Sequence, residues 1–360
     1  MQAKGLILLF VFLLFFFFPR NTFAAIFSIG PGDITGLINA INIANSNTEI
    51  DTINLFENSK YELITVNNSA YSKNGLPVII SEIVINGNNS TIIRNSSENF
   101  RIIILTSPGK LTINNLIIEG GYDDDRIDNF GGGGILNSEG NLIINDSIIT
   151  NNRTEWGGGG GIWIGENSPT KIINTKINNN TVGRDGSGGG ILKRGAGITE
   201  IINSEIFENS AQNIGGAIYS GNGLDGNPGE LIQITNTKIT NNFAINNGGA
   251  IFNFSGNFNI NNSCFSINSS TSIFNYSTNY LNLTNNYWGH ESGPSGVGPG
   301  SGDSISSNVD YLPFLTDCPP PPSPSPSPSP EPSILPSPLP SPQPTKTPVV
   351  MLPGFGGSWN

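Results

Sequence analysis

Carboxylates are the side chains in this sequence that could do chemistry, and several of them precede glycine-rich stretches. Asp123, Asp124 and Asp125 are consecutive, and Arg126 and Asp128 follow them closely. A loop of this composition could wrap a weak Ca²⁺ ion, because Ca²⁺ takes oxygen ligands in flexible geometry. Three consecutive carboxylates cannot all face one site, so a solvated loop is the simpler interpretation. We therefore expect no cofactor, with Ca²⁺ held by Asp123, Asp125 and Asp128 as the alternative.

Glu155 and Asp185 form the best candidate for a catalytic carboxylate pair. Both stand shortly before a glycine corner in adjacent repeats, so they could lie within one or two strand spacings of each other. Polysaccharide hydrolases use paired carboxylates, and lyases use acidic clusters with Ca²⁺ or a basic residue. Glu166 is a further candidate for such a site, and so is Arg184, which directly precedes Asp185.

Other catalytic and metal chemistries have few residues available. The one histidine, His290, follows Tyr287 and Trp288, an aromatic pair that we expect to plug the end of the fold, so His290 is predicted to be structural or exposed. No Gly-x-Ser-x-Gly motif occurs in the chain. Cys264 and Cys318 are the only cysteines, and with one histidine they cannot build a metal site. In an oxidising compartment they could form a disulfide, and two free thiols are the alternative.

Positioning these side chains requires regular elements, and residues 111–288 supply them as an internal repeat. One motif is Asn, a small polar residue, any residue and a large apolar residue, beginning at Asn145, Asn174, Asn203, Asn236 and Asn262. Three residues after each apolar residue stands another Asn, at Asn151, Asn180, Asn209, Asn242 and Asn268. A second motif, Gly-Gly-Gly/Ala-Ile, ends at Ile135, Ile162, Ile191, Ile218 and Ile251, with a diverged copy at Ile273. Its copies are 27, 29, 27, 33 and 22 residues apart.

This period, with β-branched runs between Asn and Gly corners, predicts an all-β fold, a right-handed single-stranded parallel β-helix with three strands in each coil. Leucine-rich repeats are excluded because Leu is scarce at fixed positions, and helical repeats because no 3.6-residue period appears. Asn tolerates the left-handed conformation at a corner, and its amide can bond to the Asn of the next coil. One column is predicted to point inward: Ile143, Ile172, Ile201, Ile234 and Ile260. Another is predicted to face solvent: Ser147, Lys176, Glu205, Lys238 and Cys264.

Two stretches also resemble known proteins. The segments IFENSAQNIGGAIYS (206–220) and FSIN (265–268) resemble the GGAI and FxxN repeats of polymorphic outer membrane proteins. The segment NNYWGHESGPSG (285–296), followed by VDYLPFL (309–315), is similar to the closing motif of many secreted bacterial β-helix proteins of the pectin-lyase-like superfamily. This resemblance covers roughly residues 30–315. It implies the fold but no activity, because that superfamily includes lyases, hydrolases, adhesins and non-catalytic surface proteins.

The N-terminal residues predict export and a capped fold. Residues 1–24 have Lys4, an apolar run and a small-residue cleavage site, the pattern of a secretory signal peptide. The apolar run is short for a membrane span, and an uncleaved signal anchor is the alternative. Residues 25–317 are predicted to form the β-helix region. At its start, the pattern of residues 31–46 predicts an amphipathic α-helix with Asp33 as N-cap. This helix would cover the open first coil.

The C-terminal residues predict a closing motif, a linker and a second domain. After the closing motif at 285–315, residues 318–348 alternate Pro with Ser and predict a disordered, extended linker. The stretch VVMLPGFGGSWN (349–360) resembles the first strand and oxyanion-loop entry of α/β-hydrolases of the lipase and esterase kind. The resemblance implies the truncated start of such a domain, and an apolar tail or sorting signal is the alternative. With no nucleophile elbow, we expect no esterase activity from this chain.

Charge and composition limit the partners. The formal net charge is −11, which argues against nucleic acid and anionic membranes. Amide and hydroxyl side chains dominate the polar positions and suit contacts with sugars. We expect a monomeric, secreted or surface-displayed bacterial protein with no transmembrane span after signal removal, non-catalytic, used for adhesion to an extracellular polysaccharide or a cell surface. The alternatives are a polysaccharide lyase or hydrolase on the β-helix, and the accessory region of a secreted α/β-hydrolase.

Overall fold

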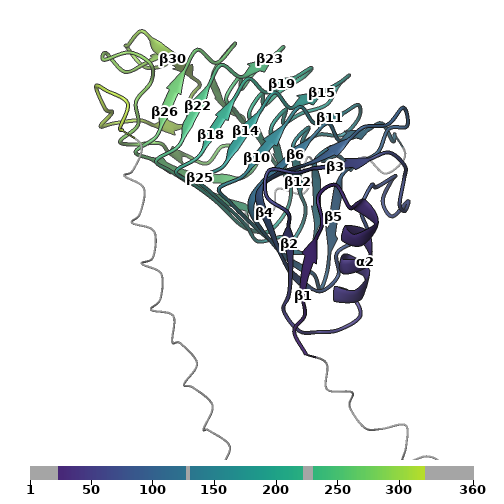
Figure 1. The fold of residues 1–360 in the computed structure, drawn as a ribbon. Helices are drawn as coiled ribbons and strands as arrows, with labels where there is room; N and C mark the ends of the chain where they lie inside the picture. The colour runs from purple at the N-terminus through teal and green to yellow at the C-terminus, as the bar shows by residue number, and fades with distance from the viewer. Residues whose placement is uncertain (1–22, 127–129, 222–229, 321–360) are drawn as a thin grey trace, which may run out of the picture. The chain divides into compact units, whose positions relative to one another are not determined.

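The computed structural model describes residues 23–126, 130–221 and 230–320 of the chain. These residues form a parallel β-helix, in which equivalent strands of successive coils pair in parallel along three sheets (Figure 1). The predicted all-β class is therefore confirmed. The predicted signal peptide up to residue 22, the predicted linker beyond residue 320 and the segment 349–360 lie outside the described residues.

Each sheet takes one side of successive coils. The largest, of 17 strands, comprises β1 (Ile26–Ile29), β2 (Asp51–Leu55), β3 (Lys60–Leu63), β4 (Glu82–Arg94), β6 (Lys110–Glu119), β9 (Asn141–Asn145), β10 (Ile148–Thr150), β13 (Thr170–Ile173), β14 (Lys176–Asn178), β17 (Gly197–Ile202), β18 (Glu205–Phe207), β21 (Glu230–Thr235), β22 (Lys238–Thr240), β25 (Asn257–Asn261), β26 (Cys264–Ser266), β28 (Leu281–Asn282) and β31 (Val309–Asp310). The five-stranded sheet comprises β7 (Tyr122–Asp123), β11 (Arg153–Thr154), β15 (Thr181–Val182), β19 (Ser210–Ala211) and β23 (Phe243–Ala244). The nine-stranded sheet comprises β5 (Ile103–Thr106), β8 (Ile135–Ser138), β12 (Ile162–Ile164), β16 (Ile191–Lys193), β20 (Ile218–Ser220), β24 (Ile251–Asn253), β27 (Ile273–Asn275), β29 (Pro294–Gly296) and β30 (Gly302–Ile305).

A regular coil has four strands, not the three expected, because one side is divided by a bend. The bend is a residue in the left-handed region, with φ between 48° and 52°, at Asp146, Asn174, Asn203, Asn236 and Asn262. Their short polar side chains tolerate this conformation. The opposite corner uses glycine with φ between 64° and 79°, at Gly132, Gly159, Gly188, Gly215 and Gly248, where a Cβ would collide with backbone of the following strand.

Aliphatic columns fill the interior. The Ile residues that end the glycine motif stack on one another from β8 to β27, and all are at most 1% exposed. A second column faces them from the 17-stranded sheet: Ile144, Ile172, Ile201, Ile234 and Ile260. Four of the five residues predicted for this column are confirmed.

The first regular coil was assigned one residue out of register. Ile144, not Ile143, pairs with Ile172, so Ile143 faces outward with Lys171. The two Asn motifs of this coil are wrong by the same one residue. The structure has Asn152 where the sequence predicts Asn151, and the residue at the bend is Asp146 where the sequence predicts Asn145. Ser147, predicted to face solvent, is 2% exposed. A one-residue slip exchanges the two faces of a strand. It arose because Asn145 and Asn151 happen to precede the two true corner residues.

A buried ladder of amides runs along one corner. Its members are Asn152, Asn180, Asn209, Asn242 and Asn268. Each of the first four donates its backbone N–H and its Nδ2–H to the Oδ1 of the next Asn, at 3.0 to 3.1 Å. The last amide, Asn268, donates to the carboxylate of Asp303, which is the final acceptor. Burial raises the pKa of Asp303, and its hydrogen bonds oppose the rise.

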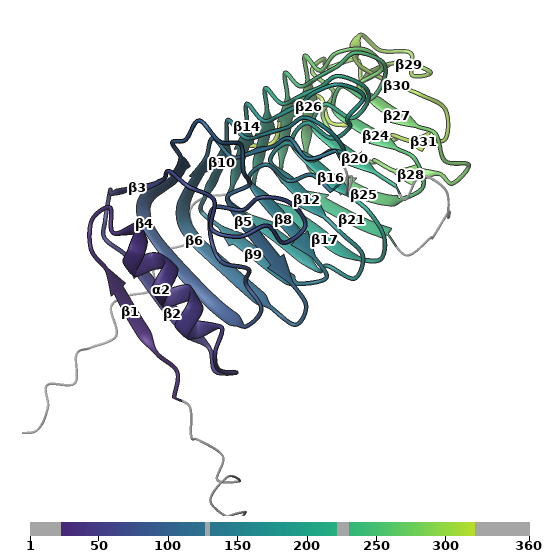
Figure 2. The same cartoon turned by 90° about the vertical axis from the view of Figure 1, so that its right-hand side faces the viewer.

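Both ends of the β-helix are covered. Helix α2 (Ile34–Ala44) lies at the N-terminal end, with Asp33 accepting a hydrogen bond from the Gly36 N–H, and it buries Leu37 and Ile41 against the first coils (Figure 2). The predicted capping helix is thus confirmed. At the other end Trp288 is fully buried and stacks on Phe265, with ring centroids 5.0 Å apart.

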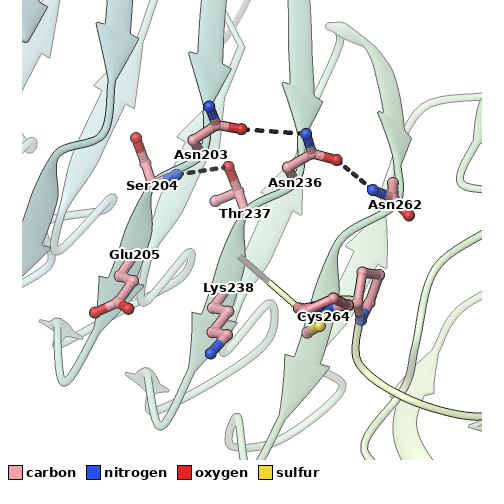
Figure 3. A pocket seen from close by; sticks show the side chains of 10 residues that line it. Asn203, Ser204, Glu205, Asn236, Thr237, Lys238, Asn262 and Cys264 are labelled. Carbon is pink, nitrogen blue, oxygen red and sulfur yellow. Dashed lines mark hydrogen bonds between the residues drawn. The ribbon is translucent and has the colours of Figure 1, made fainter. Parts of the chain in front are cut away.

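Cys264 and Cys318 form a disulfide, with Cα atoms 5.5 Å apart. Cys264 pairs with Lys238 in register and so lies on the outer face as predicted, yet it is only 4% exposed. Pro319 and Pro320, together with Cys264, line a hollow of about 30 Å³ on this face, beside Asn203, Asn236 and Asn262 (Figure 3). The disulfide therefore fixes the chain at residue 318 to the outer face of β26.

Candidate functional site

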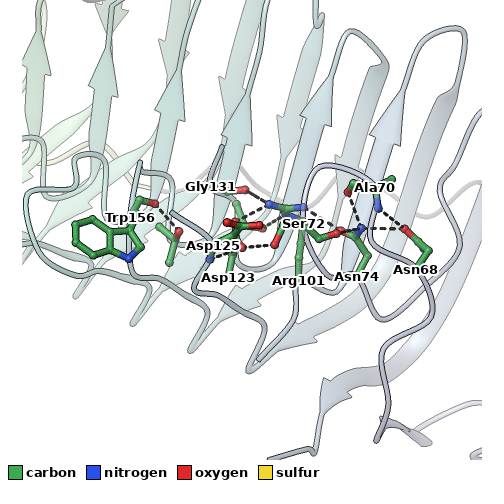
Figure 4. Close-up of polar contacts among 11 residues, drawn as sticks. Asn68, Ala70, Ser72, Asn74, Arg101, Asp123, Asp125, Gly131 and Trp156 are labelled. Carbon is green, nitrogen blue, oxygen red and sulfur yellow. Dashed lines mark hydrogen bonds and ion pairs between the residues drawn. The ribbon is translucent and has the colours of Figure 1, made fainter. Parts of the chain in front are cut away.

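Asp123, the first residue of the acidic loop, lies in a buried polar cluster (Figure 4). Its carboxylate forms an ion pair with Arg101, Nη2 to Oδ2 2.6 Å, and accepts a hydrogen bond from the Ser72 hydroxyl at 2.7 Å. Both partners of the ion pair have fully buried side chains. Arg101 also donates to Asn74 Oδ1 and to the carbonyl of Gly131. Each charge therefore has partners that offset the cost of burying it.

This cluster joins the segments that contain Ser72, Arg101 and Gly131. Burial raises the pKa of Asp123 and lowers that of Arg101, and in each case the opposite charge counteracts the shift. Within the residues that the structure describes, no group of three or more His, Cys, Asp or Glu side chains could hold a metal ion. Asp128 lies outside those residues, so Ca²⁺ binding with Asp125 and Asp128 stays a prediction.

Glu155 is held by three donors and is not paired with Asp185. Its carboxylate lies 2.6 Å from Arg153 Nη2 and 3.2 Å from Arg184 Nε, and it accepts a hydrogen bond from the Tyr122 hydroxyl at 3.1 Å. Hydrogen bonds from Arg153 above all hold the pKa of Glu155 below its ordinary value. A carboxylate stabilised in this way is a poor general acid.

The strand register also separates the two predicted catalytic residues. Thr154 pairs with Val182, which brings Glu155 opposite Gly183 and leaves Asp185 two residues further along the next coil. A Cβ on Gly183 would lie 2.7 Å from the Glu155 carboxylate, which confirms this alignment. Glu155 and Asp185 do not occupy equivalent positions, contrary to the sequence prediction.

The outer face of the nine-stranded sheet carries an apolar row that sequence reasoning missed. Its buried members stack in register from β5 to β24: Ile104, Leu136, Trp163, Leu192, Tyr219 and Phe252. The row continues through Phe274, which stacks on Phe252 with ring centroids 5.3 Å apart. The signal was present, because a large apolar residue directly follows the Ile of every glycine motif. Adjacent strand residues face opposite sides, so such a residue must point outward.

Two clefts open along this row. The Tyr71 cleft, of about 290 Å³, is lined by Tyr71, Phe130, Ser138, Glu139, Trp163, Glu166 and Arg194. The Trp156 cleft, of about 210 Å³, is lined by Trp156, Gly157, Asp185, Gly186, Ser187, Leu192, Arg194 and Tyr219. Because Arg194 lines both, the two clefts adjoin. We call them together the groove.

Aromatic rings and charged groups share the groove. Phe130 makes edge-to-face contacts with Tyr71 and Trp163, with centroids 5.2 and 5.1 Å apart. Glu139 and Glu166 are exposed, and each lies two residues after the paired residues Asn137 and Ile164, in turns of adjacent coils that both contribute to the Tyr71 cleft. The groove therefore combines apolar ring faces with convergent polar groups, the usual composition of a small-molecule site.

No protein-family model matches this chain, and no curated protein matches it. The function is therefore inferred from the groove itself. Within residues 23–126, 130–221 and 230–320, no helix has the length and apolar character needed to cross a membrane. His290 is exposed and lies at the end of the β-helix away from the groove residues, with Nδ1 2.8 Å from the Ser292 hydroxyl.

Proposed function

We propose that this protein is a secreted or surface-displayed bacterial β-helix that contacts an extracellular polysaccharide through the groove, without cleaving it. The observation that carries the proposal is the Tyr71 cleft, where the exposed ring of Tyr71 and the rings of Phe130 and Trp163 lie beside Glu139, Glu166 and Arg194. A cleft lined by aromatic rings and a few polar groups is the usual form of a small-molecule site.

The chemistry of the groove suits sugar rings. A sugar presents an apolar face of C–H groups and a rim of hydroxyls, so it needs both a flat aromatic surface and hydrogen-bonding groups. Tyr71 is 42% exposed and provides an aromatic wall, while Trp163 forms part of the floor. The clefts follow one another along the axis of the β-helix, which favours a linear chain over a single sugar.

A second candidate is a polysaccharide lyase or hydrolase acting in the same groove. The observation that favours it is that two carboxylates, Glu139 and Glu166, line the Tyr71 cleft, since paired carboxylates cleave glycosidic bonds. Neither Glu155 nor Asp185 supports it as a pair, for the reasons given above. The accessory-region hypothesis depends on residues 349–360, which lie outside the described residues, and stays a prediction.

A glycan array probed with the full chain tests the proposal, followed by reducing-end assays on every glycan that binds. We expect binding without turnover, and Tyr71→Ala should weaken it by about tenfold, the value of one lost aromatic contact. Tyr280→Ala is the matched control, because Tyr280 is 73% exposed and does not line the groove. Turnover abolished by Glu166→Gln would establish the enzyme instead, and binding equally insensitive to both tyrosine variants would refute the groove as the site.

A further inference from the structure

The groove carries more carboxylates than cations. Glu139, Glu166 and Asp185 line its two clefts, and Arg194, which lines both, is the one basic side chain among the described residues that line them. Three carboxylates against one guanidinium give the lining a formal charge of −2, and two against one give the Tyr71 cleft −1. The charge of the groove therefore favours a cationic ligand.

The two glutamates of the Tyr71 cleft are not used by the fold. Both are exposed, and within the described residues neither carboxylate forms an ion pair, even with Arg194 in the same lining. Carboxylates on the outer face of the 17-stranded sheet are instead paired with lysines, as in Glu82 with Lys110 at 3.1 Å and Glu200 with Lys171 at 3.3 Å. The charge of Glu139 and Glu166 is therefore available to a ligand.

Three aromatic rings line the same cleft. The planes of Tyr71 and Phe130 are inclined by 85°, and those of Phe130 and Trp163 by 75°, so neighbouring rings stand nearly at right angles. The negative face of an aromatic ring attracts a cation, and several such rings together hold ammonium groups in proteins. The rings and the two carboxylates thus favour the same kind of ligand group.

Trp163 leaves a hydrogen-bond donor unpaired in the floor of this cleft. Its side chain is 4% exposed, and its indole N–H has no partner among the described residues. Buried donors are ordinarily paired, so a ligand that fills the cleft would complete this bond with an acceptor. An ammonium group has no acceptor, whereas a sugar hydroxyl has one. The cleft therefore fits a ligand that carries hydroxyl oxygens beside its positive charge.

Resting on the polysaccharide contact proposed above, we propose that the Tyr71 cleft recognises a sugar with a protonated amino group, as in a deacetylated amino-sugar polymer. The ammonium group contacts the carboxylates of Glu139 and Glu166, the sugar ring packs on Tyr71, and a hydroxyl oxygen accepts from the indole N–H of Trp163. An N-acetylated sugar lacks the charge, and an acidic sugar is repelled by the groove.

Calorimetry on the full chain compares the glucosamine hexamer, its N-acetylated form and hexalysine at about pH 5.5, where the amino groups are protonated and glutamates ionised. We expect the deacetylated hexamer to bind about fivefold more tightly than the acetylated one, the value of one exposed ionic contact. Salt raised from about 20 mM to about 0.5 M should narrow the difference. Hexalysine has ammonium groups but no sugar ring, so equally tight, Glu166-dependent binding of hexalysine would overturn the assignment to a sugar.

Three variants locate the contact. Glu166→Gln should lose the fivefold preference for the deacetylated hexamer, and Glu208→Gln should keep it, because Glu208 is exposed, lies outside the groove and removes the same charge. Arg194→Gln removes a like charge from the lining and should raise the preference about twofold, and a fall in preference would overturn the ammonium site. Thermal melts check that each variant is folded.

Equal affinity for the two sugar hexamers, or equal losses in the two glutamate variants, would also overturn the ammonium site. If glycans bind on the array and Tyr71→Ala weakens them while these charge effects are absent, the proposed function stands alone. If no glycan binds, both fail.

Discussion

Replacing Asn209 by Ala tests whether the buried amide ladder supports the β-helix. Asn209 lies in the middle of the ladder and is fully buried. Its Oδ1 accepts from the N–H and the Nδ2–H of Asn180, both at 3.0 Å. Its own Nδ2 donates to the carbonyls of Ile177 and Phe207 and to Asn242 Oδ1, at 2.9 to 3.1 Å. The substitution leaves these groups buried in two adjoining coils without partners.

The expected cost follows from this count. The Asn209 side chain has two Nδ2 hydrogens, which three acceptors share, and its Oδ1 accepts two hydrogen bonds. Counting one bond for each hydrogen gives four hydrogen bonds, each worth about 1 kcal/mol net, so the free energy of unfolding should fall by about 4 kcal/mol. Asn203→Ala is the matched control in the same coil. Asn203 has φ of 52° and accepts one side-chain bond from Asn236 at 3.1 Å. Its loss should be about 1 to 2 kcal/mol, from one bond and the left-handed backbone of Ala.

Urea unfolding of both variants, followed by circular dichroism, measures the difference through the midpoints at a common slope. Hydrogen exchange should locate the loss, because coils of a solenoid contact only their neighbours and the effect of Asn209→Ala should concentrate in the coils around it. If the two variants lose the same stability within about 0.5 kcal/mol, Asn209 contributes no more than the bend residue Asn203, and the proposed support of the β-helix by the ladder is refuted.

Three further outcomes follow from the coil geometry. Ile267 is a β-branched residue with a strained, left-handed φ of 60°, and the equivalent position of the preceding coil holds Asn241. In thermal melts Ile267→Asn should therefore raise stability by about 1 kcal/mol, and Asn241→Ile should lower it. No change in either variant would contradict backbone strain at Ile267. Ile172→Asp should cost several kcal/mol by burying an unpaired charge, while Lys176→Asp on the opposite face should cost under about 1 kcal/mol, and equal costs would reverse the facing assignment. Arg153 holds the pKa of Glu155 below its ordinary value, so this pair stabilises the fold above the ordinary carboxyl pKa, and the gain is lost as pH falls through the lowered pKa. Glu155→Gln should therefore flatten the decline of the melting temperature below about pH 4.3. An unchanged decline would show that the pair contributes nothing to stability.

The sequence by itself determined the coil. Gly, Asn and Ile recur in columns because each corner and each inward position of a coil has one steric requirement, and every coil repeats it. That repetition predicted four of five members of one inward column and the left-handed Asn corners, and a separate amphipathic pattern predicted the capping helix with Asp33 as N-cap. It was misleading in the first regular coil, where two extra Asn residues imitate the corners and shift the register by one, and it also missed the fourth strand of each coil and the offset between Glu155 and Asp185.

Only the tertiary structure decided how the groove is built. Phe130 packs on Trp163 and Tyr71 packs on Phe130, from loops 33 and 92 residues away from Trp163, and no local period specifies where such loops pack. The same holds for Arg101 and Asp123, whose pairing withdraws one carboxylate of the acidic run from solvent. The corners repeat because backbone geometry fixes them, whereas the groove depends on side chains meeting once in space. A pattern read along the chain records the first kind of constraint and carries no signal for the second.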